Sequence, residues 1–329
     1  MADLVAVRRA LLSVSDKRDL IELGRFLAEQ GVELIASGGT RTALEAVGLP
    51  VIEVSAYTGQ KEILGGRVKT LHPKLHGGLL ARRNLREDMQ TLEKEGMEPI
   101  DLVVVNLYPF ENTVARPECP LEDAVENIDI GGPSLIRGAS KNHAFVTVLT
   151  APEQYDAFIH EIRSQGGTTR AFRERLAREA FALTARYDAA ISAYLSQNLG
   201  EPEPFPPSMA LAFERRASLR YGENPHQRAA FYVEPNASGA NLATAKVRHG
   251  KELSYNNLLD LDSAIRLVRL FREPAAVVLK HNNPCGAAES DDLASAFERA
   301  YEGDPVSAFG GIVGLNRPVD LATAEKMAT

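Results

Sequence analysis

The segment Val32-Glu33-Leu34-Ile35-Ala36-Ser37-Gly38-Gly39-Thr40 decides the fold of the first half of this chain. Its first five residues are mostly apolar, which predicts a short buried β-strand. Residues 41–47 then predict a helix that Gly48 ends, because glycine readily adopts the left-handed conformation that follows a helix. The segment is therefore a strand, a glycine turn and a helix, the unit from which parallel sheets are built.

The same alternation continues on both sides of this segment. Residues 10–14 form an apolar run, and residues 20–30 carry leucines at helical spacing. Residues 102–105 and 145–149 predict two more buried strands. Strands and helices that alternate in this way predict an α/β domain whose parallel sheet has helices on both faces.

A second domain is predicted after a proline-rich linker. Residues 169–197 predict one long helix, because apolar side chains recur every three or four residues. Residues 201–208 contain four prolines, which neither a helix nor a central strand accepts. We therefore predict a first domain at residues 1–200, a linker at 201–208 and a second domain at 209–329. The second domain also alternates strands and helices, at residues 229–233, 258–271, 275–279, 292–301 and 312–315, which predicts a second α/β fold.

Composition and charge narrow the function. A chain of 329 residues is longer than a single hydrophobic core usually supports, which suggests two domains. Its net charge of −7 argues against nucleic-acid binding through a basic surface. No apolar run approaches the 18 or so residues of a membrane helix, and the N-terminus does not resemble a secretion signal. Cys119 and Cys285 lie far apart and outside any CxxC pair, so neither a disulfide framework nor a zinc site is expected. We predict a cytoplasmic protein.

The turn Ser37-Gly38-Gly39-Thr40 has two interpretations. Glycines allow close approach of a ligand to the backbone, and free N–H groups at a helix start favour a phosphate. A Gly-Gly turn with a capping hydroxyl is also a common structural device. Both interpretations stay open, although the absence of a GxxxxGK[ST] or GxGxxG pattern argues against a Walker loop or a dinucleotide site.

A basic segment, Gly65-Gly66-Arg67-Val68-Lys69-Thr70-Leu71-His72-Pro73-Lys74-Leu75-His76-Gly77-Gly78, suits a small anionic ligand. Arg67 can bind a phosphate bidentately, and Lys69 is placed among other cations. Pro73 opposes a regular helix through the segment. His72 and His76 have the spacing of a helical metal pair, but the segment supplies no carboxylate or thiolate, so no metal is predicted. A solvated charged loop is the structural alternative.

Two further segments of the first domain carry candidate catalytic groups. Asn106-Leu107-Tyr108-Pro109-Phe110 follows a predicted strand, where parallel sheets present side chains to a ligand crevice. Asn106 could bind a heterocycle edge and Tyr108 could donate to an oxyanion, or the segment is an aromatic turn. Asp129 precedes Gly131-Gly132-Pro133, a typical helix start, and is either a proton carrier or a helix cap.

In the second domain the strand at 275–279 leads to Lys280-His281-Asn282-Asn283-Pro284-Cys285-Gly286. A histidine base beside a lysine that stabilises an oxyanion would suit acyl transfer. Cys285, placed between proline and glycine, is interpreted as structural rather than nucleophilic. Other polar clusters occur at residues 220–227, 254–257 and 307–311.

Taken together, ten segments resemble the family of bifunctional purine enzymes that combine AICAR transformylase and IMP cyclohydrolase. They are LLSVSDK, SGGT, GGRVKTLHPKLHGG, VVVNLYPF, ENIDIGGPS, KNH, RYGENPHQ, LSYNN, KHNNPCG and DPVSAFGG, in the family's order. The resemblance implies a methylglyoxal-synthase-like first domain and a cytidine-deaminase-like second domain. It also implies that formyl-AICAR is cyclised to IMP with loss of water, and that a formyl group passes from 10-formyltetrahydrofolate to AICAR.

The resemblance assigns residues as well. A ribotide and its phosphate would be held by Ser15, Asp16, Lys17, Ser37, Gly38, Gly39, Thr40, Arg67, Val68, Lys69 and Thr70. The base would lie against Asn106, Leu107, Asp129, Ile130 and Gly131. Lys141 would be the proton donor and acceptor, supported by Lys69, Tyr108 and Asp129. In the second domain, Arg220 and Tyr221 would hold AICAR, His281 would accept a proton, Lys280 would stabilise the transition state, and Asn257 and Gly310 would line the site.

The resemblance also shapes the remaining expectations. Members of the family continue beyond residue 329 with further transformylase residues, so we expect a complete cyclohydrolase and an incomplete transformylase here. We expect a homodimer, no tightly bound cofactor, no metal, no nucleic acid and no membrane. The first domain alone would also fit a phosphate-eliminating lyase acting on dihydroxyacetone phosphate, or an effector-sensing domain of the same fold. Neither alternative accounts for NLYPF, the basic segment or the second domain.

Overall fold

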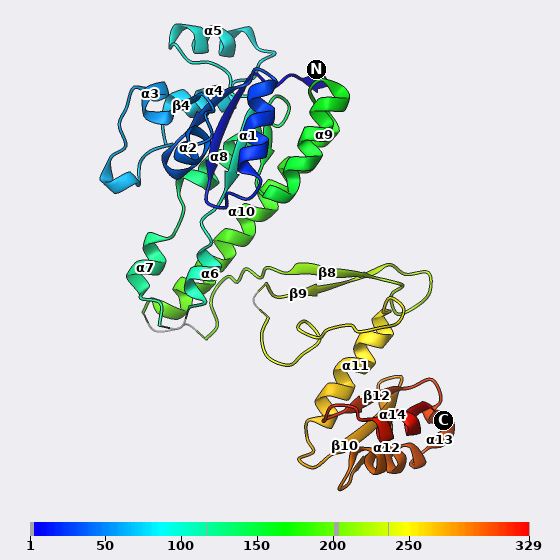
Figure 1. Ribbon diagram of the computed structural model, residues 1–329. Helices are drawn as coiled ribbons and strands as arrows, with labels where there is room; N and C mark the ends of the chain where they lie inside the picture. Colours follow the sequence, from blue (N-terminus) through cyan, green and yellow to red (C-terminus); the bar gives the residue numbers. More distant parts are fainter. Residues whose placement is uncertain (1–2, 117, 201–203, 236, 329) are drawn as a thin grey trace. The chain divides into compact units, whose positions relative to one another are not determined.

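Five parallel strands form the sheet of the first part of the protein, in the order β4-β3-β2-β5-β6 (Figure 1). The computed structural model describes residues 3–116, 118–200, 204–235 and 237–328. It divides into two units, residues 1–211 and 212–329. The strands of the first sheet are β2 (Arg9–Val14), β3 (Glu33–Ala36), β4 (Val51–Glu53), β5 (Leu102–Asn106) and β6 (Thr147–Leu149). The predicted parallel α/β fold of the first domain is confirmed.

Helices cover both faces of this sheet, as predicted (Figure 1). One group of contacting helices consists of α1 (Leu20–Glu29), α2 (Gly38–Glu45) and α9 (Tyr155–Gln165); the other consists of α4 (Pro73–Leu80), α8 (Gly131–Lys141) and α10 (Arg170–Asn198). The shorter elements are β1 (Leu4–Val5), α3 (Val54–Thr58), η1 (Leu64–Gly66), α5 (Arg86–Lys94), α6 (Phe110–Val114), α7 (Leu121–Glu126), η2 (Pro152–Gln154) and β7 (Thr168–Thr169). A continuous core of buried side chains joins the sheet to these helices.

The strand order places a topological switch point between β2 and β5. From β2 the chain proceeds to β3 and β4 on one side of the sheet, then returns to β5 and β6 on the other. Ligands of open α/β sheets bind outside the carboxyl ends of the strands at such a point, because the connecting loops diverge there. The residues that follow β2, β3 and β5 are therefore the first candidates for a site.

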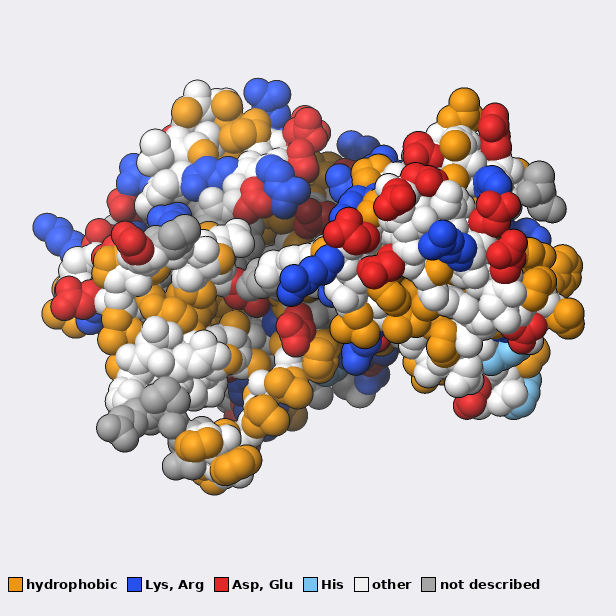
Figure 2. All heavy atoms as spheres, turned by 90° about the horizontal axis from the view of Figure 1, so that it is seen from below, with side chains coloured by type: hydrophobic (Ala, Val, Ile, Leu, Met, Phe, Trp, Pro, Cys, Tyr) orange, Lys and Arg blue, Asp and Glu red, His pale blue; other side chains and the backbone are white. Residues whose placement is uncertain are grey.

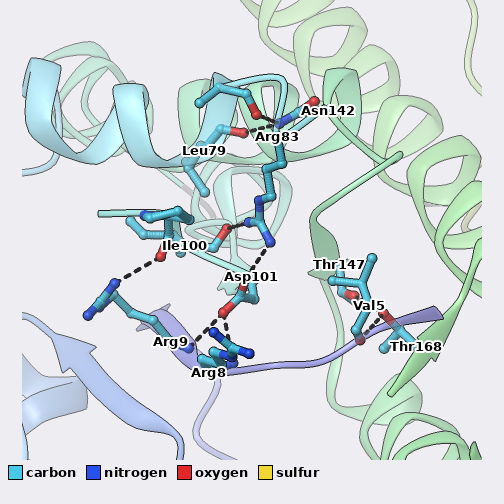
Figure 3. A network of polar contacts seen from close by, with 12 residues as sticks. Val5, Arg8, Arg9, Leu79, Arg83, Ile100, Asp101, Asn142, Thr147 and Thr168 are labelled. Atoms are coloured by element: carbon cyan, nitrogen blue, oxygen red, sulfur yellow. Dashed lines mark hydrogen bonds and ion pairs between the residues drawn. The ribbon is translucent and has the colours of Figure 1, made fainter. Parts of the chain in front are cut away.

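A polar network closes the opposite end of the sheet, where its parallel strands begin (Figure 3). The buried Asp101 carboxylate accepts hydrogen bonds from the backbone N–H groups of Arg8, at 2.7 Å, and Arg9, at 2.9 Å, and it pairs with Arg83. Asn142 donates its side-chain amide to the carbonyls of Leu79, at 2.7 Å, and of Ala81. These groups satisfy backbone atoms at the strand starts and helix ends, so this edge has a structural role.

Pro73 begins a helix instead of interrupting one. α4 starts at Pro73, and the ring nitrogen Nδ1 of His72 accepts from the N–H of Lys74 at 3.1 Å. Proline is favourable at the first helical position because the N–H it lacks would have no partner within the helix. His72 is thus a helix cap, whereas His76 lies inside the helix. Among the residues that the structure describes, no group of three metal-ligating side chains occurs.

The second unit contains two small antiparallel sheets. β8 (Glu214–Leu219) pairs with β9 (Ala229–Val233), and the other sheet has the order β11-β10-β12. The remaining elements are α11 (Tyr255–Val268), β10 (Ala275–Lys280), β11 (Asn283–Glu289), α12 (Leu293–Glu302), α13 (Pro305–Ala308), β12 (Ile312–Leu315) and α14 (Leu321–Ala328). Alternate residues of β10 pack against α11 and α12 on opposite faces. The unit is α/β, as predicted, while its cytidine-deaminase-like character stays a prediction.

β11 is one of the elements of the second unit that were not predicted from the sequence; β8, α13 and α14 are others. His281 and Asn282 have φ values of 52° and 65°, which form a two-residue turn between β10 and β11. Positive φ at both central residues is the geometry of a tight hairpin turn. Pro284 and Gly286 are unusual in strands, and they conceal this hairpin in the sequence.

Surface charge is mixed on the face drawn in Figure 2, where basic and acidic side chains are interspersed. In the described part of the chain, no helix is long and apolar enough to cross a membrane.

Candidate active site

The site is built on the loop that follows β2 and on Asn106 at the end of β5. The side-chain oxygen of Asn106 accepts hydrogen bonds from the N–H of Ser15 at 2.6 Å and from the N–H of Asp16 at 2.9 Å. The Ser15 hydroxyl donates to the Leu107 carbonyl at 2.8 Å. The side-chain amide of Asn106 donates to the Asp16 carbonyl at 3.1 Å. Asn106 therefore fixes the shape of the loop at the switch point, and its predicted contact with a base stays a prediction.

The start of α2 lies beside this loop. Gly38 has a φ of 50°, and the buried Ser37 stands at the N-cap position. The Thr40 hydroxyl accepts from the Val14 N–H at 2.9 Å and donates to the Val14 carbonyl at 3.1 Å. Thr40 thus ties the helix start to the end of β2. The first N–H groups of the helix point outward from its end, where they favour an anion.

Two lysines flank this helix start. A Cβ atom added to Gly38 would lie 3.1 Å from Lys69 Nζ, and one added to Gly39 would lie 3.5 Å from Lys17 Nζ. Lys69 also forms an ion pair with Glu62 at 2.8 Å. The two ammonium groups and the helix terminus together place positive charge at the carboxyl ends of the strands, next to the Glu62 carboxylate.

A cavity of about 300 Å³ opens next to Lys69. It is lined by Ser37, Glu53, Val54, Ser55, Gln60, Lys61, Glu62 and Lys69. The cavity carries both signs of charge, and Glu62 holds the Lys69 ammonium at its wall. In the sequence Lys69 is surrounded by cations, whereas in the structure its immediate partner is the Glu62 carboxylate.

The segment 67–70 connects the starts of α2 and α8. A Cβ atom added to Gly131 would lie 2.5 Å from the hydroxyl oxygen of the buried Thr70, so this segment reaches the first residue of α8. Val68 pairs with Ile63 in an isolated β-bridge. Arg67 forms an exposed ion pair with Glu126, the last residue of α7. The basic segment is therefore a folded connection between two helix starts.

Asp129 lies just before α8 and caps it. One carboxylate oxygen accepts from the N–H of Gly132 at 2.8 Å. Burial raises the pKa of Asp129, while hydrogen bonds from the backbone of Gly132, Tyr108 and Gly131 oppose that rise. A carboxyl group with a raised pKa and a fixed orientation is a candidate for proton transfer.

Tyr108 and Ile130 keep exposed side chains at this edge, with 54% and 58% of their surfaces accessible. Both follow structural anchors: Tyr108 stands two residues beyond Asn106, and Ile130 directly after Asp129. Their accessible side chains are free to meet a ligand in the described structure.

Lys141 is not brought to this group. It is the last residue of α8, whereas Gly131 is the first. Ten residues of α-helix span about 15 Å, so Lys141 stands at the other end of the helix, where its side chain is exposed. Its neighbour Asn142 belongs to the polar network at the opposite edge of the sheet.

In the second unit the structure brings the predicted residues into two small groups. Arg220 stacks over the Tyr221 ring at 4.9 Å, and the Tyr221 carbonyl accepts from the N–H of Tyr255 at the start of α11. Asn257, on the first turn of that helix, forms a capping box with Ser254. The segments that carry Arg220, Tyr221 and Asn257 are therefore adjacent.

The second group surrounds the hairpin turn of β10 and β11. Lys280 donates its ammonium to the Phe309 carbonyl at 2.8 Å, next to Gly310, which has a φ of 75°. His281 lies exposed in the turn. Asp260, one turn along α11 from Asn257, accepts from the N–H of Asn282 at 2.6 Å. α11 thus links the two groups.

Sequence reasoning missed three residues that the structure places at the first site. Glu62 and Glu126 pair with the two cations of segment 67–70. Tyr187, far along the chain on α10, contacts the backbone of Asp129. The carboxylates had no motif to mark them, and Tyr187 was assigned only to the apolar stripe of its helix.

Comparison with known proteins matches two sequence models to different parts of the chain. The sequence model of the family described as "AICARFT/IMPCHase bienzyme" matches residues 139–329, which is more than half of the chain. A second model, described as "MGS-like domain", matches residues 19–134.

Curated relatives share about half of their residues with this chain. It is 51% identical over 320 residues to the bifunctional purine biosynthesis protein PurH of Bacillus cereus (strain AH820) and equally to that of Halalkalibacterium halodurans. Each alignment covers 97% of this chain and 62% of the relative, so the chain spans less than two thirds of their length. The crystal structure of ForH is 34% identical, with a TM-score of 0.52, and the match covers 57% of this chain and 98% of ForH.

Proposed function

The chain belongs to the AICARFT/IMPCHase bienzyme family, and from that premise we propose that its first unit closes the ring of formyl-AICAR to give IMP and water. One observation carries the proposal. The glycine start of α2 stands between Lys17 and Lys69, while segment 67–70 connects it to the start of α8, where Asp129 lies. A phosphate position and a proton-transfer group are thereby held at one edge of the sheet.

The ribotide phosphate is proposed to bind at the start of α2. The N–H groups of Gly38 and Gly39, the hydroxyl of Ser37 and the ammonium groups of Lys17 and Lys69 supply donors and positive charge there. Segment 67–70 and the loop at residues 15–17 complete the cradle. Arg67 and Lys69 would exchange their present carboxylate partners, Glu126 and Glu62, for the anionic ligand.

The base is proposed to lie between the residues that follow β5 and the start of α8. Leu107 and Ile130 would contact its faces, and Gly131 allows close approach to the backbone. Asn106 contributes by holding the loop of Ser15 and Asp16 in shape.

Ring closure requires one bond to form, one to break and protons to move. The carboxamide nitrogen attacks the formyl carbon, so a C–N bond forms, the nitrogen loses a proton and the former carbonyl oxygen gains one. The former formamide nitrogen then loses its proton, the hydroxyl group gains one, and cleavage of the C–O bond releases water as the ring becomes aromatic. We assign acceptance of the nitrogen's proton to Asp129, whose pKa is raised by burial. Lys69 and Tyr108 would donate to the developing oxyanion.

Lys141 enters the proposal differently from the expectation drawn from the family. Within this chain it lies about one helix length from Asp129, so proton transfer is assigned to the groups that converge. A role for Lys141 as proton donor and acceptor stays a prediction.

The second unit is proposed to contribute to formyl transfer from 10-formyltetrahydrofolate to AICAR in the longer proteins of the family. Arg220 and Tyr221 would hold AICAR, His281 would accept a proton and Lys280 would stabilise the transition state. Asn257 and Gly310 would line the same site, which the adjacency of these segments on α11 and β10 supports. The folate is a co-substrate, and no tightly bound cofactor is proposed. We also propose a cytoplasmic homodimer whose partners are these small molecules rather than nucleic acid or membrane.

The deciding experiment follows ring closure of synthetic formyl-AICAR by its ultraviolet absorbance, without folate. Rapid formation of IMP is expected. Lys17→Ala is expected to raise the KM for formyl-AICAR at least tenfold, the cost of one strong phosphate contact of about 1.4 kcal/mol or more. Lys94→Ala, a control on the exposed side of α5, should change nothing.

Two results would contradict the proposal. One is a folded wild-type protein that does not cyclise formyl-AICAR at all. The other is stabilisation against heat by dihydroxyacetone phosphate and not by IMP, which would favour a phosphate-eliminating lyase.

A further inference from the structure

Tyr187 joins two points of the loop that carries Asp129. Its hydroxyl accepts a hydrogen bond from the N–H of Asp129 at 2.8 Å and donates one to the carbonyl of Asn127 at 3.4 Å. The side chain is only 6% exposed, and it comes from α10, 58 residues further along the chain. One hydroxyl therefore satisfies a donor and an acceptor of a loop that forms neither strand nor helix.

The same side chain supports the loop that carries Tyr108. The Tyr187 ring meets the Phe110 ring edge-on, with ring centres 6.2 Å apart and planes at 71°. Phe110 is fully buried two residues beyond Tyr108. Edge-to-face pairs of this kind contribute about 0.5–1.5 kcal/mol beyond the area they bury. Tyr187 of α10 therefore contacts both the loop that carries Asp129 and the loop that carries Tyr108.

The hydroxyl keeps its proton over the working pH range. Burial raises the pKa of Tyr187 to about 12, so the group stays neutral and can accept and donate at the same time. Because the Asp129 carboxylate also accepts from Gly132, the backbone of Asp129 is anchored on the Tyr187 side and its side chain on the α8 side.

We propose that Tyr187 is a positioning residue for ring closure, acting through the backbone of Asp129 and through the Phe110 anchor of Tyr108. The inference rests on the proposed function of the first unit. It adds a residue on α10 to a site otherwise built from residues between Ser15 and Gly132. Tyr187 touches neither substrate nor reacting atoms in this account; it sets the direction of the carboxylate that does.

The test compares Tyr187→Phe with Tyr194→Phe. Tyr194 lies two turns further along α10, and its ring packs edge-on against the same Phe110 at 5.7 Å. In the described part of the chain its hydroxyl has no hydrogen-bond partner, so it serves as a matched control. Both substitutions keep the aromatic ring and remove one oxygen.

Tyr187→Phe is expected to lower the kcat for ring closure about tenfold and to change KM less than about twofold, whereas Tyr194→Phe should match the wild type. The acidic limb of the pH profile should also move to lower pH in Tyr187→Phe. A released loop exposes Asp129 to water, and its pKa then falls toward the ordinary value. Equal kinetic constants and equal pH profiles in the wild type and Tyr187→Phe would overturn the proposal, as would equal losses in both variants.

A second measurement does not depend on turnover. Amide hydrogen exchange in residues 127–132 should be faster in Tyr187→Phe than in Tyr194→Phe, because the N–H of Asp129 loses its acceptor. If the wild type fails to cyclise formyl-AICAR, the proposed function falls, and exchange then decides only whether Tyr187 holds the Asp129 loop in place. Faster exchange only in Tyr187→Phe then supports it, and equal exchange in the two variants rejects it.

Discussion

At the scale of the residue, burial of the Asp129 carboxylate lowers the stability of the folded protein, and it does so at a group that we propose takes part in proton transfer. Its carboxyl group is half-buried at the start of α8 and has a raised pKa because burial disfavours the charged form. The Asp129 carboxyl group therefore holds its proton more tightly in the folded protein than in the unfolded chain. This contribution to stability is complete below the ordinary aspartate pKa of 3.8 and is lost as the pH rises through the raised value.

Asp129→Asn should separate stability from activity. Asparagine carries no charge at any pH and keeps an oxygen that can accept from Gly132. We expect a higher Tm than the wild type at pH 7, and a difference that shrinks as the pH approaches 3.8. Ring closure should fall by about 10²–10⁴-fold, the usual loss on removing a general acid or base. Thermal melts across pH and the absorbance assay measure the two effects. A variant that is less stable than the wild type at pH 7 would show that Asp129 is not held at an energetic cost.

At the scale of the element, α8 connects two edges of the sheet with different roles. Its first turn faces Asp129 and Thr70, while its last turn leads into Asn142 and the structural network. Three glycines along the helix have different surroundings. A Cβ atom on Gly132 would lie 2.5 Å from the Asp129 carboxylate and 2.8 Å from Leu107, whereas one on Gly138 would lie 3.7 Å from His76. A Cβ atom on Gly131 would likewise lie 2.5 Å from the hydroxyl oxygen of Thr70.

These surroundings predict opposite results for one substitution on one helix. Gly132→Ala should displace the Asp129 carboxylate and lower ring closure at least tenfold. Gly138→Ala should leave activity unchanged and stabilise the protein by about 0.5–1 kcal/mol, because alanine favours helix and the added methyl meets ordinary contact. Chemical denaturation and the absorbance assay check both variants. Equal activity in the two would mean that the tight contact at Gly132 does not orient Asp129.

At the scale of the molecule, each unit has its own apolar core. The first core joins buried side chains between residues 10 and 180, and the cores of the second unit lie between residues 264 and 315. Residues 1–211 include all of the parallel sheet, α10 and every group assigned to ring closure. The first unit should therefore fold without the second.

A protein consisting of residues 1–211 is expected to bind IMP within about twofold of the affinity of the whole chain. It should unfold in one cooperative transition with a similar Tm. Calorimetric titration and differential scanning calorimetry provide the measurements. An aggregated fragment, or one that folds without binding IMP, would show that the second unit is needed to form the site.

The sequence alone determined the α/β architecture of both units and the family. Apolar runs of four or five residues next to helical periodicity identify buried parallel strands, because such strands are covered on both faces. β9 and β12 have the bounds that were predicted, and β2, β5 and β10 each differ by one residue at one end. β11 was missed because Pro284 and Gly286 oppose a strand locally, while pairing with β10 supplies the hydrogen bonds that override that preference. α4 was not predicted; it begins at Pro73, and residues 67–72 lie outside it.

Only the tertiary structure decided which of the motif residues meet. The strand order brings Ser15 and Asn106 together across 91 residues, and no local pattern contains that order. Helix length separates Lys141 from Asp129, although the two stand only twelve positions apart in the sequence. Glu62 and Tyr187 reach the site through packing of distant elements, so neither has a local signal. Local propensity is a property of neighbours along the chain, whereas a site is a property of neighbours in space.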